Sequence, residues 1–166
     1  MQIKEYFTLD ENEKQMYLAQ IKQSDWGAGK YLYELLKSES LKKLCGEKAK
    51  VLLLTEKEKL ISFCTFAEKD DIPTTELTPW VGFVYTFPNY RGKRRIGKLL
   101  ECAYSLAKLN GDKHIYISTN ENGLYEKYGY TFYKIMKDIN GEDSRVYITN
   151  IDWFQEQYFM GELYRK

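Results

Sequence analysis

The chain has 166 residues, 43% of them hydrophobic, which is enough for one domain of ordinary size with a buried core. Its 25 basic and 24 acidic residues leave a formal net charge of +1, so no overall field attracts nucleic acid or an anionic membrane. We therefore expect a single domain over residues 1–166, with neither a nucleic-acid nor a membrane partner.

The cysteines and the amino-terminal segment indicate where the protein works. Cys45, Cys64 and Cys102 are far apart, form no CxxC pair and have only His114 as a nitrogen ligand, which is typical of a reduced, metal-free protein. The segment MQIKEYFTLDENEK lacks the apolar region of a signal peptide, and no apolar run approaches the ~20 residues of a membrane helix. We predict a cytoplasmic protein without a metal.

The first half of the chain predicts a strand, two helices and a hairpin. Asp10 and Glu13 form a capping-box pattern that opens the first helix, and Asp25 is placed to cap the second. A tight charged turn joins two β-rich runs into an antiparallel hairpin. The predicted ranges are 2–7, 10–22, 27–37 with another turn through 44, 50–56 and 59–67.

The second half predicts a crossover between parallel strands, followed by a closing hairpin. A polar loop over 68–79 precedes an apolar strand, and the helix behind that strand keeps an apolar stripe. One structural interpretation of Asp143 and Arg145 is an ion pair between them across the closing hairpin. The predicted ranges are strand 80–87, helix 96–110, strand 114–119, short helix 123–128 and strands 130–139 and 145–151.

The stretch YRGKRRIGKLL, residues 90–100, places cations and glycines where a strand turns into a helix. Main-chain N–H groups at a helix start bind anions, and cations there are unfavourable unless an anion lies between them. The pattern of residues 92–98 also matches the G-x-x-x-x-G-K of nucleotide P-loops, but Leu99 stands where Ser or Thr must meet Mg²⁺. The loop therefore indicates a phosphate ligand, and the nucleotidase interpretation is disfavoured.

Residues 81–130 resemble the central half of the GNAT acetyltransferases. The resemblance rests on P-x-Y-R-G-K-x-x-I-G-K-L-L after a strand and on G-L-Y-E-K-Y-G-Y after the next strand. It implies an α/β GNAT fold, with a central mixed, mostly antiparallel sheet of about seven strands, about four flanking helices and a splayed parallel pair at the centre. The loop departs from the usual family core, because Arg95 stands where the first glycine is expected.

The resemblance also implies a binding site for acetyl-CoA as co-substrate. The loop amides and the helix start would hold the pyrophosphate, the main chain of the strand before them would bind the pantetheine arm and the thioester, and two asparagines are further candidates for the pantetheine. The loop residues are Arg91, Gly92, Lys93, Arg94, Arg95, Ile96, Gly97 and Lys98; the strand residues are Val84, Tyr85 and Thr86; the asparagines are Asn120 and Asn122.

Tyr125, in the second motif, corresponds to the family's tyrosine that gives a proton to the departing thiolate. A phenol of pKa ~10 is a suitable donor for a thiol of pKa ~8.5. A base for the amine is not identified by any motif. The candidates are Glu68, Asp70, Asp71, Glu76, Asp143 or a water molecule.

We expect an N-acetyltransferase that transfers an acetyl group directly to a primary amine of a small molecule or peptide. The alternative is a catalytically silent module that binds CoA or a partner protein on the same fold. The acidic loop 68–79, with Trp26, Trp80 and the tyrosines, suits a cationic acceptor. The sequence leaves open whether residues 153–164 add a helix to the sheet or mediate a homodimer.

Overall fold

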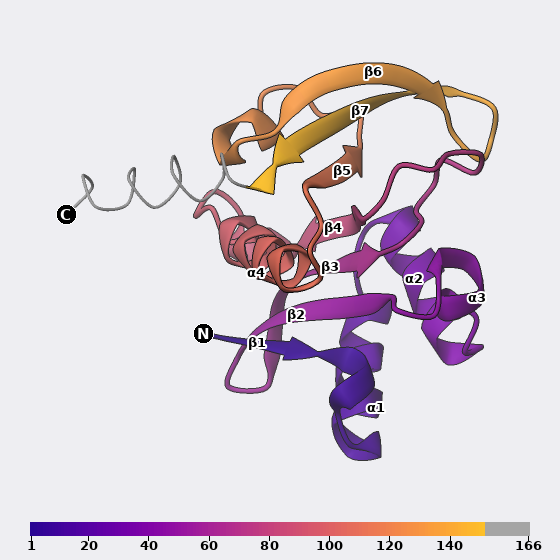
Figure 1. The fold of residues 1–166 in the computed structure, drawn as a ribbon. Coiled ribbons are helices and arrows are strands. Elements are labelled where there is room, and N and C mark those ends of the chain that lie inside the picture. Colours follow the sequence, from indigo (N-terminus) through magenta and orange to yellow (C-terminus); the bar gives the residue numbers. More distant parts are fainter. Residues whose placement is uncertain (152–166) are drawn as a thin grey trace. The chain divides into compact units, whose positions relative to one another are not determined.

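The computed structural model describes residues 1–151, which contain a seven-stranded sheet of order β1-β2-β3-β4-β5-β7-β6 (Figure 1). The strands are β1 (Gln2–Glu5), β2 (Lys50–Glu56), β3 (Lys59–Ala67), β4 (Trp80–Thr86), β5 (His114–Ser118), β6 (Thr131–Lys137) and β7 (Asp143–Asn150). The helices are α1 (Glu11–Lys22), α2 (Gly27–Lys37), α3 (Leu41–Cys45) and α4 (Ile96–Leu109), with 3₁₀ turns η1 (Tyr6–Thr8), η2 (Pro88–Tyr90) and η3 (Tyr125–Tyr128). The predicted α/β class with a mixed sheet is confirmed.

The chain divides into two compact units. The first contains Met1–Glu68 and Gly82–Leu99, and the second contains Lys69–Val81 and the chain from Leu100 onward. The division falls within β4 and within α4, so each of these elements belongs partly to both units. The expectation of a single domain over residues 1–166 stays a prediction.

The first unit is built on the antiparallel strands β1, β2 and β3, with α1 and α2 packed on one another (Figure 1). The β2–β3 turn places Lys57 and Glu58 at φ 47° and 67°, the left-handed pair that matches the twist of a hairpin. Alternating and helical apolar positions meet in one core, which includes Tyr17, Ile21, Leu32, Leu36, Val51, Leu53, Phe63 and Tyr85.

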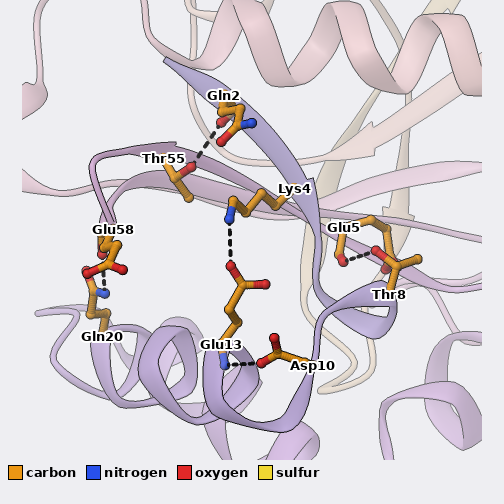
Figure 2. Close-up of polar contacts among 9 residues, drawn as sticks. All are labelled: Gln2, Lys4, Glu5, Thr8, Asp10, Glu13, Gln20, Thr55 and Glu58. Atoms are coloured by element: carbon orange, nitrogen blue, oxygen red, sulfur yellow. Dashed lines mark hydrogen bonds and ion pairs between the residues drawn. The ribbon is translucent and has the colours of Figure 1, made fainter.

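The start of α1 confirms half of the predicted capping box (Figure 2). Asp10 accepts a hydrogen bond from the amide of Glu13 at 2.9 Å, as an N-cap should. The Glu13 side chain does not return to the cap; it pairs with Lys4 Nζ on β1 at 2.8 Å. This contact ties the first helix to the edge strand of the sheet.

The second unit contains β5, β7 and β6 as an antiparallel set (Figure 1). The first residues of β4 add to β5 in parallel, with Trp80 opposite Tyr116 and Val81 opposite Ile117. A small core gathers Ile72, Trp80, Tyr116 and Val146. The predicted parallel crossover is therefore confirmed, with a ladder of those two residue pairs.

Several local details differ from the sequence predictions. The predicted short helix is the 3₁₀ turn Tyr125–Tyr128, the last strand begins at Asp143, and three further differences follow. The first strand ends at Glu5, because residues 6–8 turn into a 3₁₀ helix. Asp25 does not cap α2, whose N-cap is Trp26, because its carboxylate is bonded to Tyr85. Asp143 does not pair with Arg145: it lies opposite Lys137 and binds that ammonium at 2.6 Å, while Arg145 lies over the Phe132 ring.

Two further expectations concern helices. No helix within the described residues is both long and apolar enough to cross a membrane. The role suggested for residues 153–164, as an added helix or a dimer contact, lies outside the described residues.

Candidate functional site

The basic loop connects β4 to α4 in the way that the sequence predicts. β4 ends at Thr86, a 3₁₀ turn follows at Pro88–Tyr90, and α4 begins at Ile96. Two loop residues, Gly92 and Arg94, have positive φ values of 78° and 53°. Since the φ sign alternates over residues 92–95, the loop has the backbone pattern of an anion-binding nest.

The amides of this loop are available to a ligand. In the described part of the chain, the N–H groups of residues 92–96 donate to no protein acceptor. Hydrogen bonding within the helix begins at Gly97 and Lys98, whose amides donate to the carbonyls of Arg94 and Arg95 at 3.1 and 3.3 Å. A helix start leaves its first N–H groups unsatisfied, and here the preceding turn adds more of them.

The cationic side chains of the loop fall into two groups. Arg91, Lys93, Arg94 and Lys98 are exposed. Arg95 is half-buried: one terminal nitrogen lies 3.3 Å from the Met1 sulfur, and its buried Nε has no hydrogen-bond partner among the described residues. The loop therefore combines unengaged main-chain donors with exposed positive charges, a set that fits a diphosphate.

The competing P-loop interpretation finds no support in this geometry. Leu99, at the position where a P-loop needs a hydroxyl for Mg²⁺, is fully buried in the core. As a separate observation, no three His, Cys, Asp or Glu side chains gather within residues 1–151 where they could hold a metal ion.

Some main-chain groups of residues 84–86 already form hydrogen bonds within the protein. The Tyr85 carbonyl accepts a hydrogen bond from Ser62 Oγ at 2.6 Å, and the amide of Phe87 donates to Ile61 on β3. Because main-chain groups alternate along a strand, Val84 and Thr86 face away from β3. The Thr86 carbonyl accepts from Arg91 Nε at 2.8 Å. Val84 and the amide of Thr86 are thus the better placed candidates for the pantetheine arm.

A cluster that the sequence does not reveal joins the α1–α2 connection to β4 and the loop. The Tyr85 hydroxyl donates a hydrogen bond to Asp25 Oδ1 and accepts one from the Asp25 amide at 3.2 Å. Arg91 reaches the same Oδ1 at 3.4 Å and lies over the Tyr85 ring. The hydrogen bond from Tyr85 lowers the pKa of Asp25, and burial with that same bond raises the pKa of Tyr85.

Tyr125 lies in the second unit, at the first position of η3. Its side chain is buried, its ring packs edge-on against Tyr130, and its carbonyl accepts from the Tyr130 amide. Gly129 ends the turn with φ 92°, as the motif requires. Asn122 accepts a hydrogen bond from the Tyr147 hydroxyl at 3.2 Å, whereas Asn120 is exposed.

Among the acids considered as a base, Asp70 and Asp71 form a distinct pair in the second unit. Burial and the neighbouring Asp71 carboxylate raise the pKa of Asp70 to about 8. Burial also raises the pKa of Asp71. A hydrogen bond with Ser118, at the end of β5, acts in the opposite direction and lowers it by less. One oxygen of Asp71 is buried and has no hydrogen-bond partner in the described chain. The pair is suited to exchange a proton near neutral pH.

The other acids are less suited to this role. Glu68 accepts a hydrogen bond from the Lys48 amide at 2.9 Å, and Asp143 forms an ion pair with Lys137. Glu76 is exposed. Glu68 and Asp143 thus already use carboxylate oxygens for partners within the protein.

Comparisons with known proteins agree with this geometry. The model of the acetyltransferase (GNAT) family matches residues 11–130. No curated protein matches the sequence at a significant level.

Solved structures share the fold at low sequence identity. An aminoglycoside 6'-acetyltransferase type Ii matches with a TM-score of 0.65 and 16% identity, over 91% of this chain and 97% of that one. An aminoglycoside 6'-N-acetyltransferase complexed with coenzyme A matches with a TM-score of 0.64 and 12% identity, over 91% and 97%. ElaA of Escherichia coli matches with a TM-score of 0.61 and 12% identity, over 89% and 97%.

Proposed function

Because the chain belongs to the acetyltransferase (GNAT) family, we propose that it is an N-acetyltransferase that moves the acetyl group of acetyl-CoA directly to a primary amine. The observation that carries this proposal is the run of unengaged amides at residues 92–96, next to exposed Lys93, Arg94 and Lys98. Main-chain N–H groups at a helix start are suited to a diphosphate, which CoA carries and which small acyl donors lack.

Bond changes at the thioester define what the protein must supply. The acceptor nitrogen forms a bond to the acetyl carbonyl carbon, the C–S bond breaks, and the CoA sulfur leaves as a thiolate. Binding the diphosphate fixes the rest of the cofactor relative to the strand β4, so the thioester is oriented before the amine arrives. Val84 and the amide of Thr86 are the proposed main-chain contacts of the pantetheine arm.

Tyr125 is the proposed donor of a proton to the leaving thiolate. A phenol of pKa ~10 protonates or hydrogen-bonds a thiolate of pKa ~8.5 as the C–S bond breaks. Support comes from its place in G-L-Y-E-K-Y-G-Y and from its fixed, buried position on η3. Asn120 is a further candidate for the pantetheine; Asn122 is a weaker one, because Tyr147 already uses its side-chain oxygen.

The Asp70–Asp71 pair is the proposed acceptor of the proton that the amine must lose. An amine is protonated at neutral pH, so a base must remove one proton before its nitrogen can attack. The raised pKa of Asp70, about 8, is close to the value at which a base is both available and strong enough near neutral pH.

The test is thiol release from acetyl-CoA in the presence of a panel of primary amines. We expect turnover with some amines, and a fall in kcat of about 10² or more in Tyr125→Phe with little change in the affinity for CoA. Tyr133→Phe is the matched control, because Tyr133 is a partly exposed tyrosine of the same unit with no assigned role.

A silent CoA-binding module predicts a different result. Such a protein would bind CoA in calorimetry but release no thiol above background with any amine. That outcome would overturn the catalytic proposal and leave the binding site in place.

A further inference from the structure

Asp25 presents one free carboxylate oxygen beside the end of β4. The contacts of its carboxylate, from the Tyr85 hydroxyl and Arg91, both go to Oδ1. In the described chain, Oδ2 has no partner, and the side chain keeps 63% of its exposure. The oxygen is thus open to a donor from outside the protein, while the carboxylate itself is held in place by Tyr85.

Aromatic rings pack around Tyr85, the residue whose hydroxyl holds the Asp25 carboxylate. The Trp26 and Tyr85 rings are stacked, with centroids 5.8 Å apart and planes inclined by 7°. Phe63 and Phe87 support Tyr85 from the core, at 5.3 and 5.0 Å. Trp26 is half-buried, so part of its ring faces solvent. A carboxylate beside an exposed indole is the pairing that recognises organic cations.

The contact with Arg91 does not satisfy Asp25. Its shortest distance is 3.4 Å, and both side chains are more than half exposed, so this ion pair is a weak one. Arg91 is held more firmly by the Thr86 carbonyl at 2.8 Å. A second cation can therefore approach the carboxylate without displacing a strong partner.

The chemistry of Asp25 decides which cation it takes. The hydrogen bond from Tyr85 lowers the pKa of Asp25, so the side chain stays ionised at neutral pH and is a poor base. The amine that attacks the thioester must be neutral. Asp25 therefore suits a group that keeps its positive charge throughout the reaction.

We propose that the Asp25 carboxylate, held in place by Tyr85, and the solvent-facing part of the Trp26 ring bind a second ammonium group of the acceptor, so that the preferred substrates are diamines and larger polycations. This inference rests on the proposed acetyltransferase function and narrows its substrate class. All three residues lie in the first unit, with the loop that is proposed to hold the diphosphate.

The first experiment needs no mutation. Acetylation is measured with α,ω-diaminoalkanes of graded length and with the amino alcohols that replace one amine by a hydroxyl. We expect kcat/KM for the best diamine to exceed that of the matching amino alcohol by about tenfold or more, as one charge-assisted hydrogen bond would give. A ratio near one in the wild-type protein would overturn the inference.

The second experiment separates recognition from folding. Asp25→Asn keeps the shape and the hydrogen bond from Tyr85, and we expect it to bring the ratio close to one through a higher KM for the diamine. Glu47→Gln, which removes one exposed charge from the segment between α3 and β2, is expected to keep the wild-type ratio. An unchanged ratio in Asp25→Asn would assign this carboxylate a purely structural role.

A binding measurement distinguishes failure of the inference from failure of the proposed function. In the CoA-loaded protein, the diamine should shift the indole NMR signal of Trp26, and the amino alcohol should not. A diamine shift without turnover keeps the ammonium site and overturns catalysis. Turnover with neither a shift of the Trp26 signal nor a preference for the diamine would support catalysis and overturn the ammonium site.

Discussion

Tyr85 donates a hydrogen bond from its hydroxyl to the carboxylate of Asp25, which precedes it by 60 positions in the chain. That hydrogen bond is the largest cause of the lowered pKa of Asp25. We predict that Tyr85→Phe raises the pKa of Asp25, because the charged carboxylate loses its donor. A carbon-detected NMR titration of the Asp25 carboxyl group measures this directly. Tyr31→Phe, an exposed tyrosine on α2, is the control, and an unshifted Asp25 in Tyr85→Phe would contradict the account.

Gly92 has φ 78°, a conformation that side chains adopt only with strain, although a Cβ would meet no neighbour there. We predict that Gly92→Ala costs about 1 kcal/mol of stability or shifts the loop. Since the loop amides depend on this turn, the affinity for CoA should fall about tenfold or more. Gly27→Ala is the control, because Gly27 is also open to a Cβ but starts α2 with no positive φ. Equal CoA affinity in both variants would show that the turn is not needed.

Asp70 should make the protein less stable as pH rises. Its pKa is raised from 3.8 to about 8 in the folded state, so the folded protein binds more protons than the unfolded chain between these values. Stability from this group is therefore complete below pH 3.8 and lost as pH rises through about 8. We predict that Asp70→Asn melts higher than the wild type at alkaline pH, by roughly 3 °C or more. At acidic pH the two should melt alike. Glu76→Gln, which replaces an exposed acid of the same loop, is the matched control.

The same group should control the rate. If the Asp70–Asp71 pair accepts the amine proton, kcat/KM rises with pH through about 8, where Asp70 loses its own proton. We predict that Asp70→Asn removes this step from the pH profile. Both proteins are measured with the same acceptor amine, so the titration of that amine affects both profiles equally. A profile that keeps the step in the variant would assign the base elsewhere.

Much of the fold is predictable from local pattern. The bounds of β2, β3 and α2 match the predicted ranges, because helical apolar spacing ends near residue 37, short β-rich runs begin at residue 50, and turn residues mark the ends. The cap at Asp10 follows from a short-range hydrogen bond that the sequence spacing encodes. Such features depend on neighbours in the chain and need no knowledge of the tertiary structure.

The parts of the site that the sequence does not predict depend on distant contacts. Asp25 is a reasonable cap by its position, but it bonds to Tyr85 because the sheet brings β4 beside the α1–α2 connection. Arg94 adopts a left-handed conformation that residue preferences assign to glycine. The raised pKa of Asp70 comes from burial beside Asp71, and burial of an acid in a polar loop has no local signal.

The binding of a diphosphate by the main chain at residues 92–96 is tested most directly by amide NMR of the labelled protein. Titration with CoA should move the amide protons of these residues downfield, as N–H groups do when they donate to phosphate oxygens, and pantetheine, which lacks the diphosphate, should not. Inorganic pyrophosphate should move the same signals at higher concentration. If CoA leaves all of these amides unshifted, the loop is not the diphosphate site and the proposed acetyl transfer loses its main support.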